Sequence, residues 1–234
     1  MLPWMLAAPR FEVSMSLDQA FHHALETRDL TLVPPDAPRW VFLQWLADNG
    51  WLLHGSPTAG LHELRPRDVE YNQPDEFSNT RGVYAASDGI WAMMYALKSP
   101  RVHGQSDMGL RVRLPDGRWS DMHYFLSVAP HEPDTSTGRD LLGPGVVYVV
   151  SREGFTPSPP YDHPGLGFVQ EAHWVNPGAV IPVLAVPVVP DDFPLPVYVH
   201  DADVVMARSS SDPWGFPWLD APASTRTHEP EANS

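Results

Sequence analysis

The chain contains no cysteine and few basic residues. Without cysteine there is no disulfide framework, no thiolate zinc site and no cysteine nucleophile. This composition fits a reducing compartment, and we expect a cytoplasmic protein. Lys and Arg together number 15 against 29 Asp and Glu, which gives a formal net charge of −14. Because an acidic surface repels phosphate backbones, we expect no general affinity for DNA or RNA.

Long apolar runs are also missing. No stretch approaches the roughly 18 apolar residues that a membrane-spanning helix needs, so we expect no membrane partner. The first ten residues have neither the basic start nor the apolar length of a signal peptide.

The residues that are present suit a compact chain rich in short strands. The 234 residues are 43% hydrophobic and include nine Trp and nine Phe, enough for one sizeable core. The 27 prolines argue against a helical bundle and favour strands joined by irregular connections. We predict an α+β domain over residues 51–206. A helical segment at 1–50 packs on it, and a loosely held tail covers 207–234.

Local patterns predict the elements. Apolar periodicity predicts helices over 16–28 and 39–48, and Ser87-Asp88 can cap a third over 89–98. A hairpin begins at Leu110, turns at Pro115–Gly117 and continues toward Val128. The other predicted strands are 51–56, 81–86, 145–151, 168–174, 180–188 and an edge strand at 197–199. Residues 57–80, 129–144 and 156–165 are predicted as loops. Three aromatic residues of the tail are expected to hold its first part to the body: Trp214, Phe216 and Trp218.

One constellation carries chemical information. The apolar run Trp51–Leu53 closes on His54-Gly55-Ser56. Further on, Gly82-Val83-Tyr84 ends in a tyrosine, and a second tyrosine, Tyr95, follows eleven positions later.

These segments resemble the catalytic domain of the His-Tyr-Glu class of ADP-ribosyltransferases, which includes the poly-ADP-ribose polymerases and the diphtheria-toxin-like bacterial toxins. The resemblance covers residues 51–97 by motif and 145–188 by pattern alone. It implies a split β-sandwich in which two short, roughly perpendicular sheets surround an NAD cleft, with the helices of 16–48 on one side. It also implies NAD as a substrate and no metal.

The resemblance assigns a role to each motif residue. His54 binds the adenosine-side ribose, the Gly55 backbone holds the nicotinamide amide, and the Ser56 hydroxyl adds a hydrogen bond. Tyr84 and Tyr95 sandwich the nicotinamide ring. The chemistry agrees, because a carboxamide needs one donor and one acceptor, and flat rings bind a heteroaromatic cation well. A residue without a side chain also lets the backbone approach closely.

A glutamate on a late strand completes the implied site. Glu171 is our candidate, and Glu153 is the runner-up. In the family this carboxylate hydrogen-bonds the 2′-hydroxyl of the nicotinamide ribose and stabilises the positive charge that develops as the glycosidic bond breaks. By the same analogy, residues 57–80 wall the donor site and 155–166 face the acceptor.

We therefore predict transfer of ADP-ribose from NAD to a protein, nucleic-acid or small-molecule acceptor, with release of nicotinamide. Three alternatives stay open: NAD hydrolysis in the same pocket, a catalytically inactive NAD- or ADP-ribose-binding module, and a structural domain whose motif match is accidental. The placement of Glu171 and of the two tyrosine rings discriminates among them. Four further residues lack any familiar ligand spacing and are expected to be scattered surface or structural groups: Asp121, His123, His163 and His173.

Overall fold

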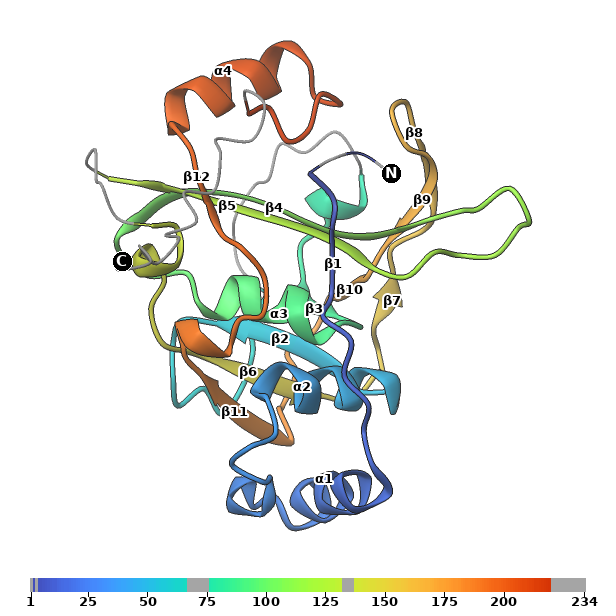
Figure 1. Cartoon of the computed structure of the whole chain (residues 1–234), viewed down its shortest axis with the longest axis vertical. Helices are drawn as coiled ribbons and strands as arrows, with labels where there is room; N and C mark the ends of the chain where they lie inside the picture. Colours follow the sequence, from blue (N-terminus) through green and yellow to red (C-terminus); the bar gives the residue numbers. More distant parts are fainter. Residues whose placement is uncertain (1, 3, 67–75, 132–136, 220–234) are drawn as a thin grey trace, which may run out of the picture.

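The computed structural model describes residues 2, 4–66, 76–131 and 137–219 (Figure 1). Within them the chain forms an α+β fold with two six-stranded sheets, confirming the predicted fold class at that level. The α-helices are α1 (Met15–Thr27), α2 (Arg39–Asp48), α3 (Gly89–Ala96) and α4 (Ala202–Ser211). Short 3-10 helices lie at Leu30–Leu32, Phe77–Asn79, Arg139–Leu141 and Pro190–Asp192.

The two sheets have separate strand orders. Sheet I runs β1-β5-β4-β9-β8, with β12 added parallel to β5. Sheet II runs β11-β6-β2-β3-β10-β7 with antiparallel neighbours. The strands of sheet I are β1 (Leu6–Ala7), β4 (Val102–Val112), β5 (His123–Pro130), β8 (Tyr161–His163), β9 (Gly167–Glu171) and β12 (Tyr198–Val199). Those of sheet II are β2 (Leu52–Ser56), β3 (Val83–Ala86), β6 (Gly145–Val150), β7 (Thr156–Pro157), β10 (His173–Asn176) and β11 (Leu184–Val188).

Helix α3 joins the two sheets. It contacts β2, β3 and β6 of sheet II and β4 of sheet I, and Figure 1 shows it between them. The predicted cap is confirmed, because Asp88 Oδ1 accepts the Trp91 backbone N–H at 2.8 Å. Almost every residue of α3 is buried, and the helix lies in the main core together with α2. It therefore holds its side chains at fixed positions relative to both sheets.

The prediction of one strand over 168–174 is wrong. The chain bends at Ala172, so β9 belongs to sheet I and β10 to sheet II. The Ala172 N–H donates to the Gly109 carbonyl of β4 at 3.3 Å, while its own carbonyl accepts the Ser87 N–H at 2.9 Å. A single buried residue thus passes the chain from one sheet to the other.

The hairpin is confirmed, but its first arm is longer than predicted. Strand β4 begins at Val102, eight residues before Leu110. The early part of this arm contains Gly104, Gln105 and Asp107, which hide the apolar alternation that indicates a strand. Several of these polar residues line the candidate site described below.

Both end segments of the described chain pack on sheet I. Strand β1 pairs with β5, and the Phe216 ring lies 5.1 Å from Trp4 and 5.3 Å from Phe125 between ring centroids. The prediction that Phe216 holds the tail to the body is confirmed. Helix α4 runs across the 206/207 boundary that we predicted between domain and tail.

No helix among residues 2, 4–66, 76–131 and 137–219 combines the length and the apolarity required to cross a bilayer.

Candidate functional site

A cleft of about 1200 Å³ takes its walls from both sheets and from α3. All six candidate site residues line it: His54, Gly55, Ser56, Tyr84, Tyr95 and Glu171. They come from β2, β3, α3 and β9, so segments distant in sequence converge on one space.

His54 stands where β2 and β3 separate. These strands share only the residue pair Leu53 and Ala86, and beyond it His54 Nδ1 lies 2.6 Å from the Tyr84 carbonyl oxygen. Because a carbonyl oxygen only accepts, Nδ1 carries the hydrogen in this contact. The imidazole therefore links the two strands and fixes its own orientation at the cleft.

Gly55 and Ser56 form a tightly packed corner. A Cβ on Gly55 would lie 2.0 Å from the Ala92 carbonyl oxygen and 3.0 Å from the Tyr95 Cβ. The missing side chain therefore lets α3 lie directly on β2, which brings Tyr95 beside the motif. Ser56 is 1% exposed, and its Oγ accepts the Thr58 N–H at 3.1 Å.

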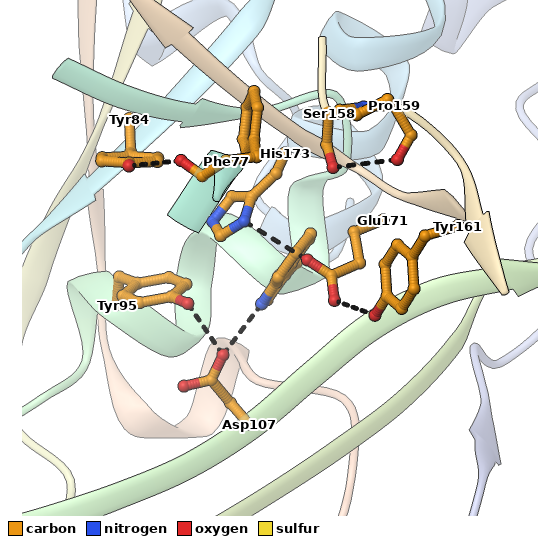
Figure 2. Close-up of polar contacts among 10 residues, drawn as sticks. Phe77, Tyr84, Tyr95, Asp107, Ser158, Pro159, Tyr161, Glu171 and His173 are labelled. Atoms are coloured by element: carbon orange, nitrogen blue, oxygen red, sulfur yellow. Dashed lines mark hydrogen bonds and ion pairs between the residues drawn. The ribbon is translucent and has the colours of Figure 1, made fainter. Parts of the chain in front are cut away.

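The two tyrosines are anchored through their hydroxyls. Tyr84 Oη lies 2.6 Å from the Thr80 carbonyl oxygen, and Tyr95 Oη donates to Asp107 Oδ1 at 2.8 Å. Figure 2 shows both rings nearly edge-on, Tyr84 above Tyr95, with their faces turned toward the space between them. Tyr95 is 37% exposed as a whole residue, yet desolvation of its hydroxyl raises its pKa, and the Asp107 carboxylate raises that pKa further.

Asp107 is a site residue that the sequence analysis missed. Its Oδ1 also accepts the Trp91 indole N–H at 3.0 Å, and its Oδ2 accepts the Gln105 amide at 2.8 Å. Asp107 is hard to identify from the sequence, because the polar residues at the start of β4 hide the pattern of a strand.

Glu171 extends into the cleft between two partners. Tyr161 Oη donates to Oε1 at 2.9 Å, and His173 Nδ1 lies 3.5 Å from Oε2 (Figure 2). The Glu171 and His173 side chains are 23% and 16% exposed. The runner-up, Glu153, is exposed in the turn after β6 and is absent from the cleft wall. The structure therefore places Glu171, and not Glu153, in the wall of the cleft that Tyr84 and Tyr95 line.

His163 and His173 also line the cleft. The His173 ring lies 4.3 Å from Trp91 and 5.5 Å from Tyr84 between centroids. His173 begins β10 directly after the bend at Ala172 and lines the same cleft as Glu171. Burial lowers the pKa of His163.

The charge of the cleft differs from that of the chain. Its described wall contains three cationic side chains, Arg65, Arg81 and Lys98, against three carboxylates, Glu63, Asp107 and Glu171. The lining is thus close to neutral in a chain of net charge −14. Among the described residues, no three His, Asp or Glu side chains are arranged to hold a metal ion.

No family model, no curated protein and no solved structure matches this chain. The functional argument therefore depends on the geometry of the cleft.

Proposed function

We propose that this protein transfers ADP-ribose from NAD to an acceptor and releases nicotinamide. One observation carries the proposal: His54, Tyr84, Tyr95 and Glu171, which lie on four different elements, line a single cleft. The resemblance in the motifs implies such a convergence, whereas an accidental motif match gives no reason for it.

The two tyrosine faces suit the nicotinamide ring. A pyridinium binds well against the face of an electron-rich ring, and Tyr84 and Tyr95 offer two such faces. Gly55 and Ser56 border the same space, and their peptide groups and hydroxyl suit a carboxamide. Arg81 and Lys98 in the cleft wall supply positive charge that suits the pyrophosphate.

Glu171 suits the bond-breaking step. As the bond between the ribose C1′ and the nicotinamide nitrogen breaks, its electron pair leaves with the nicotinamide, which becomes neutral. The positive charge then develops on the ribose, where a nearby carboxylate stabilises it. Tyr161 steadies that carboxylate by donating to Oε1. The acceptor oxygen or nitrogen then bonds to C1′ and gives its proton to solvent, and water in the same position would yield hydrolysis.

The test measures nicotinamide release from NAD by the parent protein, Glu171→Gln and Glu153→Gln. Glutamine keeps the size of the side chain and can still accept from Tyr161, but it removes the charge. We expect kcat to fall at least tenfold, on the order of losing one electrostatic stabiliser, while NAD binding persists. Glu153→Gln is the matched control, because Glu153 is exposed and outside the cleft.

Each result has a separate meaning. Equal kcat in the parent and in Glu171→Gln would remove this carboxylate from the mechanism. NAD binding without release, across protein, nucleic-acid and small-molecule acceptors, would identify an inactive binding module. Release without labelling of any acceptor would identify a hydrolase. If the parent protein shows no NAD binding and no nicotinamide release, the proposal is refuted.

A further inference from the structure

Asp107 accepts hydrogen bonds from three other side chains. Oδ1 receives the Tyr95 hydroxyl at 2.8 Å and the Trp91 indole N–H at 3.0 Å, and Oδ2 receives the Gln105 amide at 2.8 Å. Figure 2 shows the carboxylate below the Tyr95 ring, on the side away from Tyr84. Because the Trp91 and Tyr95 donors share Oδ1, one side chain sets the orientation of both rings.

Strand β4 supports the same rings in a second way. Gly109 lies two residues after Asp107 and therefore on the same face of the strand. A Cβ on Gly109 would lie 2.7 Å from the Trp91 ring, so the indole rests directly on the backbone of β4. The His173 ring lies 4.3 Å from the same indole between centroids. Trp91 thus stands between β4 and the histidine beside Glu171.

These contacts connect the two sheets. Helix α3 lies on sheet II because Gly55 leaves room for it, whereas Asp107 belongs to sheet I. The hydrogen bonds from Trp91 and Tyr95 to Asp107 therefore join α3 to the opposite wall of the cleft. They fix the Tyr95 ring relative to sheet I, which also carries Glu171.

We propose that Asp107 is the positioning residue of the nicotinamide slot, holding Tyr95 and Trp91 in the orientation that binds NAD. The inference rests on the proposed function and adds to it a residue outside the motifs. Asp107 takes no part in bond breaking. Its loss should therefore weaken the stacking of NAD in the ground state and in the transition state alike, which raises KM and leaves kcat almost unchanged.

Four variants test this role: Asp107→Ala, Asp107→Asn, Tyr95→Phe and the surface control Asp116→Ala. Asparagine keeps an oxygen that accepts from Tyr95 and Trp91. Gln105 can turn to accept from the new amide, because its own Oε1 is buried without a partner among the described residues. Tyr95→Phe keeps the stacking face and removes only the bond to Asp107. Asp116 is exposed in the turn of the same hairpin.

Nicotinamide release gives the kinetic readout. We expect KM for NAD to rise at least fivefold in Asp107→Ala and about threefold in Tyr95→Phe, with kcat within twofold of the parent. Asp107→Asn should stay within twofold in both constants, as should Asp116→Ala. Unchanged KM in both Asp107→Ala and Tyr95→Phe would overturn the inference. So would an asparagine variant as impaired as the alanine variant, because charge rather than alignment would then matter.

A second readout does not depend on activity. In ¹⁵N NMR spectra, the Trp91 indole N–H signal, assigned with Trp91→Phe, should exchange slowly in the parent and in Asp107→Asn, and rapidly in Asp107→Ala. Equal exchange in all three proteins would refute the positioning role even if the chain proves inactive on NAD. Slow exchange restored by asparagine, with no NAD binding by the parent, would leave the positioning of the rings supported and reject the proposed function alone.

Discussion

Replacing Gly55 with alanine should both destabilise the protein and displace Tyr95 in the cleft. The new Cβ would lie 2.0 Å from the Ala92 carbonyl oxygen and 2.7 Å from the Ala96 nitrogen, both backbone atoms of α3. Real Cβ contacts essentially never fall under 3.0 Å, so α3 must move away from β2 by about 1 Å. Overpacking of this kind costs about 1–3 kcal/mol.

Thermal unfolding measures the first effect. For a chain of this size each kcal/mol corresponds to about 2–4 °C, so a cost near 2 kcal/mol lowers Tm by about 4–8 °C. The control is Gly104→Ala in β4, where a Cβ would meet its nearest atom at an ordinary 3.5 Å. With room available, alanine in a strand is more stable than glycine by about 0.5–1 kcal/mol. The two substitutions should therefore shift Tm in opposite directions.

NAD kinetics measure the second effect. Tyr95 moves with α3, and a displacement of about 1 Å in a binding group can cost on the order of a hundredfold in rate. We expect kcat/KM for nicotinamide release to fall at least tenfold in Gly55→Ala. A Gly55→Ala protein with unchanged or raised Tm would refute the reasoning, because α3 could not then lie against β2 as described.

Two further predictions concern stability. His123 and His200 are buried, and burial lowers the pKa of each imidazole from its usual value near 6.5, so the unfolded chain takes up protons that the folded chain does not. The stability that these two neutral imidazoles contribute is therefore full above pH 6.5 and is lost as the pH falls toward their folded pKa values. Urea denaturation at about pH 7.5 and 5.5 should show this loss of stability, and His123→Leu should make the loss smaller. A free energy of unfolding that rises on acidification would contradict the prediction. Asp88→Ala removes both the cap of α3 and the acceptor of the Tyr124 hydroxyl at 2.7 Å. We expect the free energy of unfolding, measured by urea denaturation, to fall by about 3 kcal/mol in Asp88→Ala and by about half of that in Asp88→Asn. Equal losses in the two variants would show that these hydrogen bonds are not the cause.

Local signals in the sequence were sufficient for several elements. The apolar pattern placed α2 at Arg39–Asp48, and the capping preference of aspartate placed the start of α3. The resemblance implied that Tyr84 and Tyr95 border one cleft, and both residues line it. These features depend on residues close together in the chain, which is where sequence patterns are informative.

Tertiary contacts decided the remaining features. Nothing local distinguishes a straight strand over 168–174 from one that bends at Ala172, because the bend follows from hydrogen bonds to Gly109 and Ser87. Asp107 was missed because the two rings that it holds, Trp91 and Tyr95, lie on α3. Helix α4 was also not predicted, although it has a local signal: Asp201 caps it by accepting the Asp203 and Val204 N–H groups.

The bend at Ala172 also constrains how this segment can evolve. Residues before it are held in register by β4, and residues after it are held by β3. Inserting or deleting one amino acid here would reverse the facing of one flank, since neighbouring strand positions point to opposite sides. Either Glu171 or His173 would then turn out of the cleft. In homologous chains, the segment from β9 to β10 should therefore tolerate substitutions but keep its number of residues.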